Sequence, residues 1–259
     1  MKITCAQFDV IYGNPEENRK KALRWITQAA EDGAEVIVLP ELWDTAYDLE
    51  RLGEIADTEG RNAISFLSGL AKKHHVHIVG GSIAYEKDGK VSNTMLVFDR
   101  DGTLNGQYSK AHLIRLMNEE KFITAGSETA HFAIDDVQCA GLICYDIRFP
   151  EWVRKIVLEG AKIVFVPAQW PIQRDKHWRT LLTARAIENQ CYIVACNRIG
   201  KDPANTFAGQ SLIIDPWGEI VAEAGSHDET LLSADIDPAL SDEVRSRIPI
   251  FEDRRENLY

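Results

Sequence analysis

The sequence contains no cluster of basic side chains. Its 259 residues include 40 acidic and 29 basic side chains, which gives a formal net charge of −11. Proteins bind nucleic acids and anionic membranes mainly through grouped lysines and arginines that displace counterions. The composition therefore argues against a general binder of nucleic acid or of a membrane surface, and we expect a small molecule as the partner.

Long apolar runs are also missing. No stretch approaches the roughly 20 apolar residues that cross a bilayer. Residues 1–10 alternate like a strand and lack the apolar block and small-residue cleavage site of a signal peptide. We therefore expect a cytoplasmic protein. The five cysteines, an odd number, suit that reducing compartment.

No linker, low-complexity tract or repeat divides the chain, so we predict one domain over residues 1–259. A strand over 3–9 precedes a helix that begins after Asn14-Pro15, and an apolar strand covers 36–39. The further elements expected are a helix near 66–71, strands 76–79, 91–98, 103–108, 132–134 and 137–143, helices 150–158 and about 178–186, and strands 163–166, 192–196, 211–214, 219–222 and 231–236. Helices interleaved with mixed runs of strands predict an α/β fold of two sheets covered by helices.

Cys144 lies where the predicted buried strand 137–143 ends and shortly before the helix that starts near Pro150. A thiol on such a turn is held out of the core, beside backbone N–H groups that can stabilise an oxyanion. Cys144 is therefore a candidate nucleophile, although most cysteines are simply small buried apolar side chains.

A cysteine nucleophile needs a group that takes its proton, and no histidine lies in a setting that points to Cys144. Glu41 and Lys110 each follow a predicted strand, where α/β folds place their chemistry. Alone, each is explained as well by a solvated surface side chain. Together with the thiol they predict covalent acid–base catalysis, because a carboxylate in a dry pocket can carry the proton while an ammonium favours the thiolate. No metal-ligand spacing is present, so we predict no metal site.

Three segments resemble, in order and spacing, the motifs of the nitrilase superfamily of carbon–nitrogen hydrolases. They read VLPELW around Glu41, YSKAHL around Lys110 and GLICYDIRFPE around Cys144. The resemblance extends through HWRTLLTARAIENQCYIVACN and FAGQSLIIDPWGEIVAEAG. Within the superfamily the chain looks most like the ω-amidase branch, whose members hydrolyse the terminal amide of 2-oxo acids and whose close bacterial relatives are associated with methionine salvage.

The resemblance implies a four-layer α-β-β-α sandwich, a homodimer or higher homo-oligomer, and no cofactor. It implies that Glu41 is the general base and acid, Lys110 the oxyanion cation and Cys144 the nucleophile. A second active-site glutamate of the family matches Glu119, although the adjacent Glu120 leaves that alignment open by one residue. The backbone N–H of Tyr145 is expected to join the oxyanion hole.

The charges of the sequence suggest how a substrate would be chosen. Arg148 and Arg174 are candidate anchors for a substrate carboxylate, through paired hydrogen bonds. Arg148 could equally orient Glu151, and Arg174 could be solvated. Trp170 is a candidate wall of the pocket or a core residue, and many relatives have Ala-Phe where this chain has Gln169-Trp170.

The implied activity is hydrolysis of 2-oxoglutaramate or 2-oxosuccinamate to the dicarboxylate and ammonia through a cysteine thioester. Hydrolysis of N-carbamoyl amino acids is an alternative, because it also needs a carboxylate anchor but releases carbon dioxide with the ammonia. An alternative of another class is a catalytically silent binding or scaffold protein that keeps the fold for its dimer surface.

Overall fold

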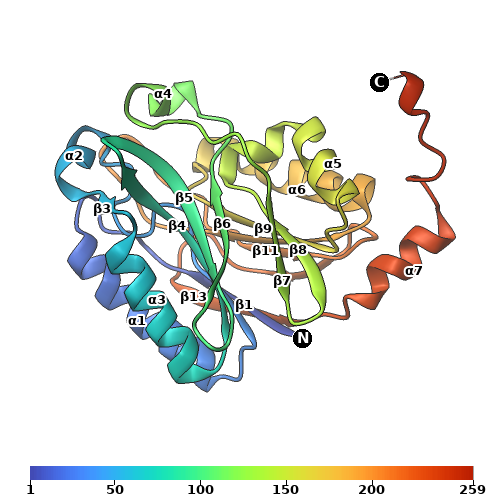
Figure 1. Cartoon of the computed structure of the whole chain (residues 1–259), viewed down its shortest axis with the longest axis horizontal. Coiled ribbons are helices and arrows are strands. Elements are labelled where there is room, and N and C mark those ends of the chain that lie inside the picture. Colours follow the sequence, from blue (N-terminus) through green and yellow to red (C-terminus); the bar gives the residue numbers. More distant parts are fainter. Residues whose placement is uncertain (259) are drawn as a thin grey trace.

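Two β-sheets lie face to face with helices on the outer side of each, in the computed structural model of the protein, which describes residues 1–258 (Figure 1). The first sheet has the strand order β13-β1-β2-β4-β5-β6, with β3 beside β4. Its strands are β1 (Lys2–Gln7), β2 (Val36–Val38), β3 (Asp57–Thr58), β4 (His77–Lys87), β5 (Lys90–Phe98), β6 (Leu104–Ser109) and β13 (Thr230–Asp235).

The second sheet has the order β12-β11-β10-β9-β8-β7. Its strands are β7 (Ala130–Ile134), β8 (Val137–Gly141), β9 (Ile163–Ala168), β10 (Tyr192–Asn197), β11 (Leu212–Ile214) and β12 (Ile220–Glu223). In both sheets the central strands run parallel and the outer hairpins antiparallel.

The longer helices form the two outer layers. Helices α1 (Pro15–Glu31) and α3 (Arg61–His74) pack on the first sheet, and α5 (Pro150–Leu158) and α6 (Asp175–Asn189) on the second (Figure 1). The remaining helical segments are α2 (Leu52–Ile55), α4 (Glu119–Phe122), α7 (Ala239–Arg247) and the short 3₁₀ turns η1 (Leu49–Arg51), η2 (Arg115–Met117), η3 (Cys144–Arg148), η4 (Ile172–Arg174) and η5 (Glu256–Leu258). This is the predicted four-layer α-β-β-α sandwich. None of the helices within residues 1–258 has the length and apolar character needed to cross a bilayer.

Local sequence explains the first helix. The Asn14 side chain accepts a hydrogen bond from the Glu17 N–H at 3.2 Å, and Pro15 occupies the first helical position, where a missing N–H costs nothing. The buried residues Ala22 and Ile26 then lie one helical turn apart and face the sheet. Burial of this apolar stripe, rather than helix propensity, fixes α1 against β1 and β2.

The core between the sheets is made of branched apolar side chains from both. Val36 and Val38 of β2 belong to the same buried cluster as Val164 and Val166 of β9. Strands that are buried on both faces read as continuous apolar runs, and these two segments do. These side chains therefore hold the two sheets together along their central strands.

Several elements differ from the sequence-based predictions: the short β3, α2 and α4 were not expected, and the largest differences are at β4 and α7. Strand β4 extends from His77 to Lys87 and pairs with β5 over most of its length, whereas the pattern indicated only 76–79. The two glycines at 80–81 interrupt the apolar run and hid the continuation. Helix α7 was not predicted, because residues 239–247 are mostly polar and show little apolar periodicity.

An irregularity in β4 supports the chain that leaves β2. The register of β4 against β5 shifts between Val79 and Ser82. Gly81 has a φ of +56°, and a Cβ at this position would lie 2.0 Å from the carbonyl oxygen of Pro40. Only glycine allows this approach, and Pro40 directly precedes Glu41.

We predict that Gly81→Ala lowers the free energy of unfolding by about 2 kcal/mol or more, since left-handed φ and the contact with Pro40 both oppose a side chain. Urea denaturation followed by circular dichroism measures it. Gly53→Ala is the matched control, because Gly53 lies in α2 with open space around it. Equal stability of the two variants would contradict this explanation of β4.

Candidate active site

Glu41 lies in a turn that follows β2 and is braced by β4. Leu42 has a positive φ of 39°, which is unusual for a residue with a side chain. The Leu42 N–H donates to Ser82 Oγ at 2.9 Å, and the Trp43 indole donates to the Gly80 carbonyl at 2.8 Å. These bonds hold the turn in its strained form and aim the Glu41 carboxylate into the interior, where it is fully buried.

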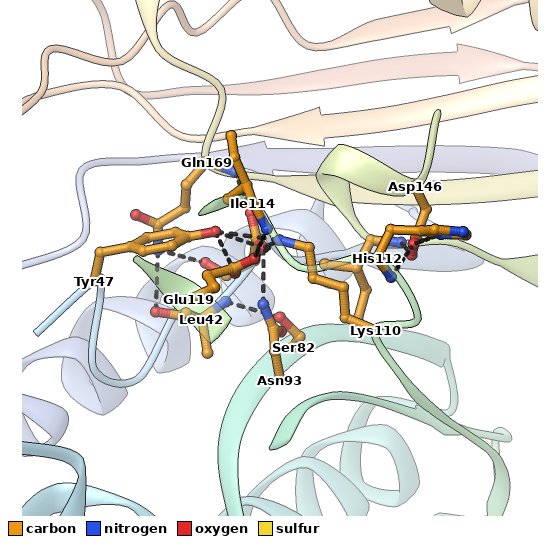
Figure 2. A network of polar contacts seen from close by, with 12 residues as sticks. Leu42, Tyr47, Ser82, Asn93, Lys110, His112, Ile114, Glu119, Asp146 and Gln169 are labelled. Atoms are coloured by element: carbon orange, nitrogen blue, oxygen red, sulfur yellow. Dashed lines mark hydrogen bonds and ion pairs between the residues drawn. The ribbon is translucent and has the colours of Figure 1, made fainter. Parts of the chain in front are cut away.

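Lys110 reaches the same point from the end of β6. Its backbone N–H donates to the Asn93 carbonyl at 2.8 Å, which continues the sheet pairing by one residue. Its ammonium donates to Glu41 Oε1 and to Glu119 Oε1, each at 2.8 Å (Figure 2). All three side chains are fully buried, so the cation lies between two carboxylates away from water.

The second glutamate of the site is Glu119. It opens α4 with its side chain fully buried, and its Oε2 accepts the Ile114 N–H at 2.7 Å. The neighbouring Glu120 is exposed. Of the two adjacent glutamates, Glu119 is therefore the one that lies in the buried cluster.

Cys144 lies on a sharp turn three residues beyond the end of β8. Its φ is +45°, and it opens the 3₁₀ turn η3. The carboxylate of Asp146 fastens this turn, because its Oδ2 accepts the Ile143 N–H at 3.0 Å and the Tyr108 hydroxyl at 2.7 Å. The other oxygen, Oδ1, accepts both the N–H and the ring of His112 (Figure 2). The buried polar network around Asp146 thus holds the backbone at Cys144 in its strained conformation.

Burial decides the protonation of the thiol. It raises the pKa of Cys144 well above its ordinary value, and the negative charge of Glu41 raises it further, while Lys110 and the Gln169 N–H act in the opposite direction. The resting cysteine is therefore a thiol in contact with a carboxylate. Such a thiol reacts once its proton has moved to that carboxylate.

The charges around Lys110 do not cancel if both glutamates are ionised. Burial alone would lower the pKa of Lys110, but the charges of Glu119 and Glu41 raise it overall. Burial raises the pKa of Glu119, with the charge of Glu41 adding to the effect and Lys110 opposing it. The raised pKa of Glu119 favours a proton on this carboxyl group, beside an ammonium on Lys110.

The two oxygens of Glu41 have different surroundings. Oε1 accepts three hydrogen bonds, from Tyr47 Oη, Asn93 Nδ2 and Lys110 Nζ, at 2.8 to 2.9 Å. Oε2 accepts the Gln169 N–H at 2.8 Å. Within residues 1–258 no second hydrogen bond to Oε2 from nitrogen or oxygen is present, so this oxygen has a lone pair available for a proton.

Sequence reasoning missed Tyr47, Asn93 and Gln169, which hold the Glu41 carboxylate. Asn93 offers the clearest signal, since a fully buried amide inside the strand β5 needs polar partners. Gln169 follows the apolar run of β9, and its side chain donates to the Glu41 carbonyl at 2.7 Å. Its side-chain oxygen accepts from Arg198 at 3.0 Å. The Gln169 side chain therefore supplies part of the support of Glu41.

A cavity of about 730 Å³ lies outside this buried cluster. Its wall includes Tyr145, Arg148, Arg174 and His177. The Arg148 guanidinium lies 4.6 Å from the centre of the Trp170 ring and 3.4 Å from His177 Nδ1. Among the described residues it makes no hydrogen bond to Glu151, which was the structural alternative.

Arg148 and Arg174 both line this cavity, and the charge of one affects the pKa of the other. Burial lowers the pKa of Arg148, and the charge of the nearby Arg174 lowers it further. Trp170 is 2% exposed, packs on Trp178 at 5.3 Å and donates to the Arg174 carbonyl at 2.7 Å. It therefore serves both as a core residue and as a support for the two arginines. No group of metal-ligating side chains is present within residues 1–258.

The carbon-nitrogen hydrolase family model matches residues 2–246. The chain belongs to this family. This hydrolase is 53% identical to the 2-oxoglutaramate amidase of Bacillus subtilis, over 99% of this chain and 98% of that protein. It is 34% identical to the human omega-amidase NIT2, over 94% and 91% of the two chains. Its fold matches a CN-hydrolase superfamily protein from Xanthomonas campestris, whose crystal structure holds an arsenic adduct in the active site, with a TM-score of 0.91, 28% identity and coverage of 98% and 97%.

Because Glu119 is buried and Glu120 is exposed, we predict that the same substitution has different effects on the activity of this hydrolase at the two positions. We expect Glu119→Gln to lower kcat by about tenfold to a hundredfold, because an amide NH₂ facing Lys110 cannot accept from its ammonium. Ammonia release under substrate saturation measures this. Glu120→Gln is the matched control and should retain full activity, and equal effects of the two changes would contradict the assignment.

Proposed function

We propose that this hydrolase is an ω-amidase that cleaves the terminal carboxamide of small 2-oxo acids such as 2-oxoglutaramate and 2-oxosuccinamate. The products are the dicarboxylate and ammonia. One observation carries the proposal: the buried cluster of Glu41, Lys110 and Glu119 adjoins Cys144, next to a cavity that contains two arginines. The similarity to the Bacillus subtilis 2-oxoglutaramate amidase over nearly all of both chains supports the same substrate class.

In the proposed first half-reaction Cys144 attacks the amide carbon while its proton moves to Glu41 Oε2. The new S–C bond gives a tetrahedral oxyanion. When the oxyanion collapses, the C–N bond breaks, and the nitrogen takes the proton from Glu41 and leaves as ammonia. In the second half-reaction water attacks the thioester carbon while Glu41 takes a water proton. The C–S bond then breaks, the sulfur takes this proton back from Glu41, and the acid is released with the thiol restored.

The proposed oxyanion hole consists of Lys110 Nζ and the backbone N–H of Tyr145. The ammonium has three N–H groups, and these contact Glu41 at 2.8 Å, Glu119 at 2.8 Å and Tyr47 Oη at 3.3 Å. The contact with Tyr47 is the longest, so it is the one that a developing oxyanion replaces at least cost. Donors of this kind are typically worth about 3 to 4 kcal/mol of barrier each.

Arg148 is the proposed anchor for the distant carboxylate of the substrate, with Arg174 beside it. A guanidinium binds a carboxylate through two parallel hydrogen bonds, and partial burial strengthens such a pair. Arg148 lies four residues beyond Cys144 and is stacked on Trp170, which fixes its plane. An anchor on the same turn as the nucleophile suits a short dicarboxylic chain with the amide at one end and the carboxylate at the other.

A homodimer stays a prediction. A surface that could serve it lies on α5 and the segment after α7, where the lining of a cavity of about 960 Å³ combines the apolar Pro150, Leu158 and Ile250 with six charged side chains. Figure 1 shows this C-terminal segment leaving the body of the molecule. A second copy packed there would cover apolar side chains that are exposed in the single chain.

We predict that 2-oxoglutaramate and 2-oxosuccinamate release ammonia with kcat/KM values at least roughly tenfold above those of glutamine and asparagine. The amino acids carry an ammonium that Arg148 and Arg174 repel, whereas a 2-oxo group is uncharged. Coupled ammonia assays measure all four rates. N-carbamoyl amino acids belong in the same panel, and faster turnover of these with release of carbon dioxide would contradict the proposal.

The arginine anchor can be tested in the same assay. Arg148→Gln should raise KM for 2-oxoglutaramate by about tenfold to a hundredfold, because a charge-assisted pair is lost, and should change little for a neutral aliphatic amide. Arg179→Gln is the control, since Arg179 lies on α6 with its charge paired to Glu223. Equal losses on charged and neutral amides would exclude Arg148 as the anchor.

A further inference from the structure

Tyr47 closes the turn that begins at Glu41. It follows Ala46, whose φ of +53° turns the chain inward, and the Ala46 N–H donates to the Leu42 carbonyl at 2.8 Å. The Tyr47 side chain is 7% exposed. Figure 2 shows its ring reaching over the cluster, with the hydroxyl toward Glu119 and Lys110. A tyrosine held in this way contributes its hydroxyl to the polar cluster and its ring to packing.

The Tyr47 hydroxyl lies between the two carboxylates. Its oxygen is 2.9 Å from Glu41 Oε1 and 2.9 Å from Glu119 Oε1. A hydroxyl has a single proton and can donate it fully to only one acceptor. Two short contacts with carboxylate oxygens are therefore both satisfied only if one of the carboxyl groups donates a proton in return.

The surroundings of Glu119 identify it as the protonated partner. Its Oε2 accepts the Ile114 N–H at 2.7 Å, and its Oε1 accepts from Lys110 Nζ at 2.8 Å, so a proton on this carboxyl group resides on Oε1, which can still accept from Lys110 while it donates to Tyr47. Glu41 instead receives three donors on Oε1 and one on Oε2, which favours the charged form. The resulting order of donation runs from Glu119 to Tyr47 and from Tyr47 to Glu41.

The charged and titratable groups that face the Tyr47 hydroxyl are Glu41 in the same turn, Lys110 after β6, Glu119 in α4 and Cys144 in η3. Burial, followed by the charges of Glu119, Glu41 and Cys144, raises the pKa of Tyr47 well above its ordinary value. The hydroxyl therefore keeps its proton throughout the working range of the enzyme and can act as a donor.

We propose that Tyr47 is a positioning residue for amide hydrolysis, whose hydroxyl connects the two carboxyl groups and keeps the proton on Glu119 and the charge on Glu41. It acts through Glu41, which exchanges the proton of Cys144, and has no contact with the reacting amide of its own. The inference needs hydrolysis of an amide by this site, as in the proposed function, but is independent of which amide is the natural substrate.

The test is Tyr47→Phe, which removes one oxygen and keeps the ring. We expect kcat/KM to fall by about tenfold to a hundredfold, as for loss of a hydrogen bond to a charged group. The acidic limb of the pH profile should move to higher pH, because the charged form of Glu41 loses a donor. Tyr192→Phe is the matched control: Tyr192 is also buried, in β10 and away from this cluster, and its variant should keep both the rate and the profile.

A second readout needs no substrate. The rate at which iodoacetamide alkylates Cys144, followed by peptide mass spectrometry, should show the same shift of its acidic limb in Tyr47→Phe. A shift without turnover of 2-oxo amides would leave the role of Tyr47 standing and overturn only the substrate. If the pH profiles of turnover and of alkylation both keep their shape in Tyr47→Phe, and only the rates fall by a constant factor, Tyr47 has a packing role. That result would overturn the proposal.

The proton on Glu119 can be observed in the unmodified enzyme. Infrared spectroscopy should show the carbonyl band of a buried carboxylic acid that disappears in Glu119→Gln and changes frequency in Tyr47→Phe, because its proton loses its acceptor. Absence of the band would contradict the proposed order of donation, even if Tyr47→Phe failed to fold.

Discussion

The ion cluster around Lys110 is the interaction on which the rest of the site depends. A buried ammonium is costly unless it is paired and hydrogen-bonded, and here two carboxyl groups contact it at 2.8 Å. The three side chains of the cluster come from separate parts of the chain: Glu41 follows β2, Lys110 follows β6 and Glu119 lies in α4. The cluster can therefore form only when the first sheet and the segment that carries Glu119 are assembled, so folding and catalytic competence are linked.

Three strained backbone positions lie at or near the points from which the reactive side chains project. Leu42, Ala46 and Cys144 all adopt positive φ, and each lies in or next to a turn that carries a functional group. Such conformations persist because neighbouring structure determines them: the irregular part of β4 holds the first turn, and Asp146 holds the second. The regular strands, which form most of the packed core, do not need such strained conformations.

Periodicity and capping predicted most of the regular elements, because α1, α5 and the hairpin of β5 and β6 are encoded by local patterns. The motifs around Glu41, Lys110 and Cys144 predicted which side chains meet. The supports of Glu41 could not be predicted, because Gln169 reaches it across the two sheets and Tyr47 resembles an ordinary core aromatic. Contacts between residues far apart in sequence leave no local signal. The predicted single domain and homodimer stay predictions.

The central claim is that Cys144, activated by Glu41, forms a thioester with the acyl group of the substrate. The most direct measurement is rapid acid quench of the enzyme during turnover of 2-oxoglutaramate, followed by mass spectrometry of the intact chain and of the peptide that contains Cys144. The mechanism predicts an adduct on Cys144 with the mass of the substrate less ammonia. No adduct at any quench time, together with ammonia release by Cys144→Ala, would contradict it.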